Sequence, residues 1–172
     1  VTTYGEKEIR EVRKRVAMVF QGAALFDSLT VGENIAYPLR EHLRELSEAD
    51  ITARVAKNLK MVNLPGIEQM RPSDLSGGMR KRVGLARAIA IEPEVILYDE
   101  PTTGLDPIST KVIDELIVSM KHQLGCTSIV VTHDMDSAFR VSDRMAMLAK
   151  RKMRVTELAD KGGKVILLSH FG

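Results

Sequence analysis

The sequence reads LSGGM at residues 75–79, VILYDEP at residues 95–101 and GLD at residues 104–106, and the other elements can be placed around these segments. The first segment opens a helix, the second is an apolar strand that ends in two carboxylates, and the third is a turn with a further carboxylate. Open α/β sheets bind ligands at the carboxyl ends of their strands. The three segments therefore predict a site for phosphate chemistry at one edge of a parallel sheet.

The two carboxylates of the second segment are Asp99 and Glu100. They follow residues 95–98, a short apolar run that is typical of a buried parallel strand. In P-loop NTPases an Asp at this place holds Mg²⁺, and a second carboxylate can act as the general base on the attacking water. An isolated Asp-Glu pair is more often solvated and idle, because strand-end turns are rich in Asp. The neighbouring motifs favour the functional interpretation here.

The first segment places Ser76 before two glycines and a run with apolar residues at helical spacing. Ser is favoured as an N-cap, and Gly77 and Gly78 would let backbone N–H groups approach an anion at the helix N-terminus. The simpler interpretation is an ordinary Ser-capped helix with a flexible glycine pair. The basic residues that follow could suggest nucleic acid, but a charged run on a helix is usually a solvated face.

Two more polar side chains are expected at strand ends. Gln21 follows a strand at residues 16–20 and could bind a metal-bound or attacking water, although a Gln-Gly turn is the more usual explanation. His133 follows a strand at residues 127–132, which would deliver it to the same sheet edge as the two carboxylates. A His there can hydrogen-bond a γ-phosphate and the catalytic carboxylate, whereas a lone His is more often structural.

The remaining elements alternate in a way that predicts an α/β fold with a parallel sheet and helices. Capping residues, prolines and glycines mark the ends of most of them. In chain order we expect a loop and short helix at 26–39 with breaks at Asn34 and Pro38, helices at 47–62, 107–124 and 135–141, and a strand at 144–148.

Composition limits the classes of function. The chain has 172 residues, enough for one domain or slightly more, and 44% of them are hydrophobic, so a real core is expected. A net charge of +2 gives no electrostatic argument for a nucleic-acid partner. The single cysteine, Cys126, excludes an internal disulfide framework and a CxxC metal site and fits a reducing compartment. No apolar run approaches the ~20 residues that span a bilayer.

The motifs together resemble those of the ABC ATPases, whereas any one alone is weak. The resemblance covers about residues 16–148 and matches, in order, the Q-loop (Gln21), the signature (75–78), Walker B (Asp99 and Glu100), the D-loop (104–106) and the H-switch (His133). The sequence FQGAALFDSLTV at residues 20–31 resembles that of the Mla-type phospholipid-transport ATPase subunit, and so does Met79, where most ABC ATPases carry Gln.

The Mla-type resemblance implies a setting. That family works peripherally at the cytoplasmic face of the inner membrane of Gram-negative bacteria. It drives lipid exchange between inner and outer membranes, together with a membrane permease and a lipid-binding partner that carries the MCE domain. The segment at residues 21–37 would couple to the permease.

The resemblance also implies roles in ATP hydrolysis. Asp99 would hold Mg²⁺ with help from Gln21, Glu100 would activate water, and His133 would contact the γ-phosphate. The signature residues and the D-loop would act on ATP held by a second ATPase subunit, so a head-to-tail dimer is implied; these residues are Ser76, Gly77, Gly78 and Asp106.

One family motif does not occur in the 172 residues: the Walker A loop, GxxxxGK[ST], which the family places upstream of Gln21 after a central strand. We therefore expect an incomplete ABC-ATPase sheet with an α-helical signature subdomain, in a chain cut before Walker A. Phosphate-loop contacts supply much of the charge stabilisation in phosphoryl transfer. Little or no ATPase activity is expected from this chain alone.

The expected organisation is a partial ABC ATPase domain at residues 1–148, with a helical subdomain at about 22–90 and a core from Walker B to the H-switch at 91–148. After residue 148 the family would continue with a short hairpin, but residues 149–172 read as a foreign or divergent tail. A helix at 155–161 and a strand at 164–169 are expected there, and the sequence of this segment resembles a short piece of phosphoglycerate kinase.

Two other functions stay open. A catalytically inert module could dock a permease through the helical region 26–74. A non-transport ABC ATPase could act on DNA or ribosomes, although the near-neutral charge and the Mla-like text argue against a nucleic-acid partner.

Overall fold

The computed structural model describes residues 3–149, 152–157 and 165–171, with side chains described up to residue 146. The chain divides into two compact units. Unit 1 comprises Val1–Ala17 and Gly22–Glu94, and unit 2 comprises Met18–Gln21 and Val95–Gly172. No helix in the described part of the chain is long and apolar enough to span a membrane.

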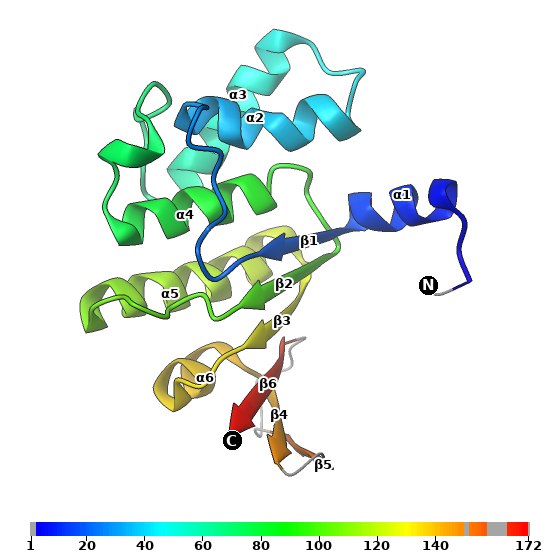
Figure 1. Ribbon diagram of the computed structural model, residues 1–172, viewed down its shortest axis with the longest axis vertical. Helices are drawn as coiled ribbons and strands as arrows, with labels where there is room; N and C mark the ends of the chain where they lie inside the picture. The colour runs from blue at the N-terminus through cyan, green and yellow to red at the C-terminus, as the bar shows by residue number, and fades with distance from the viewer. Residues whose placement is uncertain (1–2, 150–151, 158–164, 172) are drawn as a thin grey trace. The chain divides into compact units, whose positions relative to one another are not determined.

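Unit 1 is helical (Figure 1). Its elements are α1 (Glu6–Arg15), α2 (Val31–His42), α3 (Glu48–Met61), the 3-10 helix η1 (Pro72–Asp74) and α4 (Gly77–Ala88). Capping boxes begin α2 at Thr30 and α3 at Ser47, because each side-chain oxygen accepts the backbone N–H three residues on. The predicted helix at 47–62 is confirmed, including its cap.

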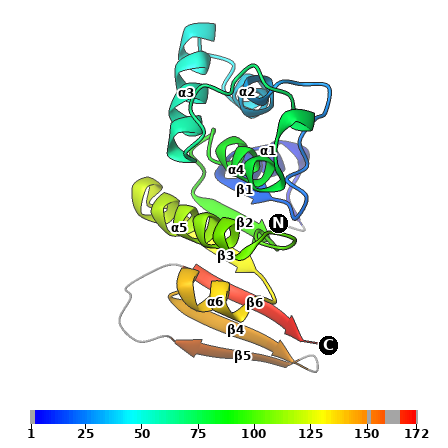
Figure 2. The same ribbon diagram turned by 90° about the vertical axis from the view of Figure 1, so that its left-hand side faces the viewer.

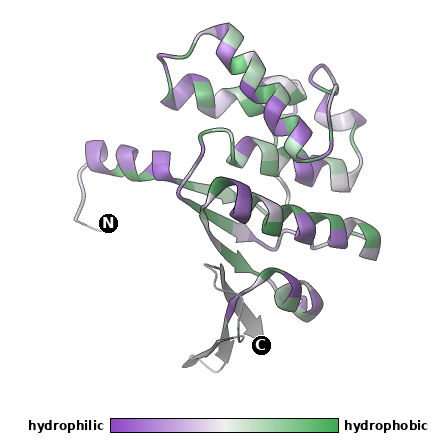
Figure 3. Ribbon diagram, turned by 180° about the vertical axis from the view of Figure 1, so that it is seen from behind, coloured by the Kyte–Doolittle hydropathy of each residue, from purple (hydrophilic) through white to green (hydrophobic). Residues whose placement is uncertain are grey.

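The core of unit 1 forms where apolar faces of α2, α3 and α4 meet. Figure 3 shows polar and apolar residues interleaved along these helices, as expected for helices with one buried stripe. The residues that are fully buried or nearly so include Ile35, Leu39, Leu59, Val83 and Leu85.

The expected breaks at Asn34 and Pro38 are wrong, because α2 runs through both residues to His42. Asn34 is fully buried, and its side-chain amide donates to the backbone oxygens of Phe26 (3.1 Å), Leu29 (3.3 Å) and Thr30 (2.9 Å). Its side-chain oxygen accepts the N–H of Phe26 at 2.8 Å. These bonds fasten the preceding loop onto the helix.

Unit 2 is built on a sheet with strand order β1-β2-β3-β6-β4-β5. Strands β2, β3, β6 and β4 pair with one another in parallel, and β5 pairs with β4 antiparallel. The α/β prediction with a parallel sheet is confirmed. The elements are β1 (Val16–Val19), of which only the last two residues belong to unit 2, and then β2 (Val95–Asp99), α5 (Pro107–Leu124), β3 (Thr127–Val131), α6 (Met135–Val141), β4 (Arg144–Ala149), β5 (Lys152–Glu157) and β6 (Val165–Phe171).

The last strand in the chain lies inside the sheet. Strand β6 pairs with β3 on one side, where Ser128 faces Val165, and with β4 on the other, where Arg144 faces Ile166 (Figure 2). The predicted strand at 164–169 thus corresponds to β6. The hairpin of β4 and β5 occupies the place where the family resemblance calls for one.

The helix expected at 155–161 differs from the structure over its first three residues, which belong to β5. Val155 and Thr156 are β-branched and favour a strand over a helix. Residues 158–161 lie outside the described residues. The foreign origin of 149–172 and the division at 22–90 and 91–148 stay predictions.

The register of β2 and β3 positions the candidate site. Asp99 lies opposite Val131, and the N–H of Glu100 donates to the Val131 oxygen at 2.9 Å. The two parallel strands therefore end together, and the residues that follow each of them lie side by side.

Candidate functional site

Glu100 and His133 are in direct contact at the carboxyl ends of β2 and β3. Nδ1 of His133 lies 2.9 Å from Oε1 of Glu100, so the ring can donate its Nδ1–H to the carboxylate. The Glu100 side chain is 20% exposed and that of His133 is 63% exposed. The sequence-based expectation that β3 delivers His133 to the carboxylate edge matches this geometry.

The backbone of Glu100 adopts an uncommon conformation. Its φ is +47°, in the left-handed region that non-glycine residues rarely occupy. The hydrogen bond from its N–H to Val131 holds it there. Backbone strain of this kind is concentrated at functional sites, where the surrounding structure compensates for it. The observation supports a functional role for Glu100.

A third residue, Thr103, contacts the same carboxylate. Its Oγ1 donates to Oε2 of Glu100 at 2.9 Å, so each carboxylate oxygen has a hydrogen-bond partner. Our sequence analysis did not identify Thr103. The three-residue separation within a turn was the available signal, since residues at i and i+3 of a turn lie close together.

The Glu100 contact also sets the electrostatics of His133. The hydrogen bond to Glu100, followed by the charge of that carboxylate, raises the pKa of the imidazole above its ordinary value. The nearby carboxylate of Asp134 acts in the same direction. The charged form is therefore more favoured than in an ordinary histidine, and a cationic ring is suited to contact a phosphate.

Local hydrogen bonds fix the turn that carries His133. The N–H of Asp134 donates to Oγ1 of Thr132 at 3.0 Å. Asp134 then caps α6, because its Oδ1 accepts the N–H groups of Asp136 at 2.9 Å and Ser137 at 3.1 Å. The residues on both sides of His133 are thus tied to the backbone.

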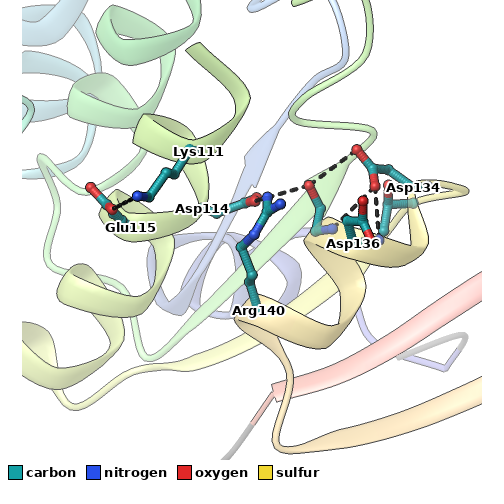
Figure 4. A network of polar contacts seen from close by, with 8 residues as sticks. Lys111, Asp114, Glu115, Asp134, Asp136 and Arg140 are labelled. Atoms are coloured by element: carbon teal, nitrogen blue, oxygen red, sulfur yellow. Dashed lines mark hydrogen bonds and ion pairs between the residues drawn. The ribbon is translucent and has the colours of Figure 1, made fainter. Parts of the chain in front are cut away.

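A buried carboxylate, Asp114, joins α6 to α5 (Figure 4). Its Oδ2 accepts hydrogen bonds from Nη1 of Arg140 at 2.8 Å and from Oγ of Ser137 at 3.0 Å. The Asp114 side chain is 2% exposed. Burial raises the pKa of this carboxyl, while the Arg140 and Ser137 hydrogen bonds act in the opposite direction. The His133 turn is therefore anchored to the long helix α5.

Asp99 and Gln21 are the predicted metal ligands. Asp99 is the last residue of β2 and is partly buried, and Gln21 is exposed two residues after β1. Within the described residues, no group of three or more His, Cys, Asp or Glu side chains could hold a metal ion. Mg²⁺ commonly uses one or two carboxylates together with substrate phosphates and water. A carboxylate and an amide oxygen fit that requirement.

The predicted signature residues begin α4 in unit 1. Ser76 is its N-cap, and its Oγ accepts the N–H of Met79 at 3.2 Å. Gly77 and Gly78 form the first two positions of this helix, so their backbone N–H groups are in its first turn. The predicted cap is confirmed, and a role in phosphate binding stays a prediction.

Asp106 has a local role that the structure defines. Its Oδ1 accepts the N–H groups of Ile108 and Ser109, each at 3.0 Å, at the N-terminus of α5. Hydrogen bonds from Ser109 contribute most to lowering the pKa of the carboxyl. Ile108 is 78% exposed, which is unusual for a large apolar residue. A role of Asp106 across a dimer contact stays a prediction.

Comparison with known proteins identifies the family of this chain. Residues 2–103 match the family model described as ABC transporter. The chain belongs to the ABC transporter family. It is 45% identical over 147 residues to the intermembrane phospholipid transport system ATP-binding protein MlaF of Haemophilus influenzae, covering 86% of this chain and 55% of that protein.

Two other proteins extend the comparison. The probable ribonucleotide transport ATP-binding protein mkl of Mycobacterium leprae is 42% identical, covering 86% of this chain and 42% of that protein. The ATP-binding cassette MJ0796, a dimer bound to ADP and Pi, has a TM-score of 0.80 at 32% identity, covering 90% of this chain and 68% of that chain. This ABC transporter chain spans about half the length of the curated relatives it matches.

In this ABC transporter chain the segment after Gln21 is fixed within unit 1. Arg87 of α4 donates to the backbone oxygens of Ala23 and Ala24, each at 2.8 Å. Both alanines have positive φ, of 63° and 47°, and a Cβ on Gly84 would come within 3.2 Å of the Ala23 side chain. The sequence analysis missed Arg87, because its partners lie more than sixty positions away.

Two aromatic residues follow this segment at the surface of unit 1. Phe26 and Tyr37 have ring centroids 5.0 Å apart and are 44% and 50% exposed. A separate pocket of about 250 Å³ lies along α2 and α3 of the same unit. Its lining includes Gly32, Ala36, Arg40, Val55 and Glu68. Both features are available to a partner.

Proposed function

We propose that this chain forms part of the ATP-binding and ATP-hydrolysing subunit of an ABC transporter that moves phospholipid between the inner and outer membranes. The observation that carries the proposal is the Glu100–His133 pair, held at 2.9 Å at the ends of neighbouring parallel strands. A carboxylate so placed can accept a proton from water, and a positively charged imidazole beside it can contact a phosphate.

Each residue of the pair and its neighbours would have its own role in ATP hydrolysis. Mg²⁺ supplies charge neutralisation on the phosphates of ATP when it is bound. Asp99, with Gln21, would hold this ion through oxygen atoms. Glu100 would orient and deprotonate the attacking water, and His133 would contact the γ-phosphate.

A second ATPase subunit is part of the proposal. The first turn of α4 presents backbone N–H groups that suit an anion, and the helix dipole adds to the attraction. In a head-to-tail dimer, Ser76, Gly77 and Gly78 would bind the γ-phosphate of ATP held by the other subunit, with Asp106 at the dimer contact. The dimeric state named for the cassette MJ0796 supports this arrangement.

The proposal that phospholipid is the substrate rests on the relatives named MlaF and on the Mla-like sequence at residues 20–31. The permease contact is assigned to the segment at residues 21–37, where the exposed rings of Phe26 and Tyr37 lie in tilted contact. An MCE-domain protein would join through the complex. The subunit would then lie peripherally on the cytoplasmic face of the inner membrane.

A second function, permease docking without hydrolysis, is supported by one specific observation. Unit 1 has its own helical core and its own exposed aromatic pair, whereas GxxxxGK[ST] is not found in the 172 residues. A pull-down with the permease separates the two functions. Capture that survives Glu100→Gln but is lost on Tyr37→Ala, in a chain without measurable turnover, would favour docking alone.

The test of the main proposal measures Mg-ATP binding by calorimetry and phosphate release on the same protein. Without the phosphate loop, this chain alone should bind ATP weakly and hydrolyse it little. Any turnover of this chain alone should be lost in Glu100→Gln and kept in Glu115→Gln. Glu115 is a matched control because it is an exposed carboxylate of α5 with a loose 3.9 Å ion pair. Turnover that persists in Glu100→Gln would refute the assignment.

A further inference from the structure

In the turn that joins β2 to α5, the side chain of Thr103 contacts the Glu100 carboxylate. The N–H of Thr103 donates to the Glu100 oxygen at 3.3 Å, and the N–H of Leu105 donates to the Thr102 oxygen at 3.2 Å. Gly104 has a φ of +77°, and Asp106 then caps α5. Backbone hydrogen bonds thus close the turn that carries Thr103, and this turn leads directly into the capped N-terminus of α5.

The side chain of Thr103 is suited to hold a fixed direction. Thr is β-branched, which limits its χ1 to few rotamers. Its Oγ1 reaches Oε2 of Glu100 at 2.9 Å, while Nδ1 of His133 reaches Oε1 at 2.9 Å. A glutamate has three side-chain torsions, and the last one is broad and roughly two-fold. Two donors on the two oxygens restrict that last torsion.

We propose that Thr103 is a positioning residue, whose hydroxyl fixes the plane of the Glu100 carboxylate so that one oxygen faces His133. For catalysis the inference rests on the proposed function of Glu100 as general base. The geometric part, the orientation of Glu100 toward His133, does not depend on ATP hydrolysis. A general base works only when its accepting oxygen is within hydrogen-bond reach of the proton it removes.

The competing explanation is that the hydroxyl only closes the turn. Three variants separate the two. Thr103→Val keeps the shape and the branching but removes the donor, Thr103→Ser keeps the donor, and Thr103→Ala removes the donor without adding apolar surface. If the Val variant does not fold, as judged by its NMR spectrum, the Ala variant supplies the same comparison.

The measurement is the imidazole NMR signal of His133 as a function of pH, recorded on the whole chain. Glu100 and Asp134 are the carboxylates that raise the pKa of this ring, and Glu100 contributes most. In Thr103→Val the carboxylate rotates more freely and spends less time on Nδ1. The pKa of His133 should therefore fall toward its ordinary value, as it should also do in Glu100→Gln. In Thr103→Ser the pKa of His133 should be the same as in the unchanged chain.

Two outcomes would overturn the inference. One is a His133 titration in Thr103→Val and Thr103→Ala that matches the unchanged chain while Glu100→Gln shifts it. The other is a Thr103→Ser variant that shifts as far as Thr103→Val, since the hydroxyl would then not be the cause. In an assembly that hydrolyses ATP, Thr103→Val should lower kcat roughly tenfold at unchanged KM. Turnover of this chain that persists in Glu100→Gln would count against the proposed function and leave the NMR comparison intact.

Discussion

Removal of Arg140 should expose how unit 2 depends on one buried charge. The Asp114 side chain is 2% exposed, and Arg140 donates to it at 2.8 Å. In Arg140→Ala the carboxylate keeps the hydrogen bond from Ser137 and loses the partner that carries the opposite charge. An uncompensated buried charge is strongly destabilising, which sets the direction of the effect.

The magnitude follows from the exposure of the two partners. Breaking a fully buried ion pair costs about 3–5 kcal/mol. The Arg140 side chain is 46% exposed, so water already screens part of the attraction and the cost is lower. One hydrogen bond to a charged group is worth about 1.5–3 kcal/mol. We therefore expect Arg140→Ala to lower the free energy of unfolding by about 2 kcal/mol near neutral pH.

The pH dependence gives the experiment its second signature. Burial raises the pKa of the Asp114 carboxyl, and Arg140 opposes the rise. Without Arg140 the native pKa should rise further above its unfolded value, so the native state binds the proton more tightly. Stability contributed by that proton is present at low pH and is lost as pH rises through the native pKa. The loss in Arg140→Ala should be smaller in acid than at neutral pH.

Urea unfolding of the whole chain at several pH values measures both effects. Lys111→Ala is the matched control, because Lys111 and Glu115 on α5 are each about two-thirds exposed and lie 3.9 Å apart. That pair should contribute less than about 0.5 kcal/mol. If Arg140→Ala costs no more than Lys111→Ala at any pH, Asp114 does not need its charged partner and the buried-charge reasoning is refuted.

Three further results are expected. Glu100→Gln should lower the pKa of His133, which the Glu100 contact raises in the folded chain. The stability from this contact is therefore present below about pH 6.5 and lost as pH rises above the folded pKa. Urea unfolding should show a larger difference between Glu100→Gln and the unchanged chain in acid than in base. Ser76→Ala removes the N-cap of α4 and should cost about 1 kcal/mol in the same assay; no loss at all would contradict the cap. Leu59→Ala empties a fully buried site among α2, α3 and α4 and should cost about 2–5 kcal/mol, with a smaller loss indicating that unit 1 collapses around the cavity.

Local signals in the sequence predicted much of the fold. Ser47 and Ser76 cap the helices they were expected to cap, and Gly125 adopts the left-handed conformation that ends α5. Such signals work because they depend on residues three or four positions apart. Glu100 and His133 could be paired because an apolar strand precedes each of them and parallel strands end at one edge.

Long-range partners could not be predicted in this way. Pro38 was expected to break α2, but the helix continues through it and buries Asn34 against the preceding loop. Arg140 and Asp114 are 26 positions apart, and nothing in one sequence says which Arg meets which Asp. Tertiary contacts override local preference at these places.

The position of β6 has a consequence for the way this protein is made. A ribosome synthesises β3 and β4 before β6, yet β6 is the strand that separates and joins them. Until residues 165–171 leave the ribosome, β3 and β4 each keep an unpaired edge, and such edges attract strands of other chains. The helices of unit 1 need no such late partner. The nascent chain should thus need protection by chaperones until β6 has been made, and its yield in cells should depend on how quickly β6 is captured between β3 and β4.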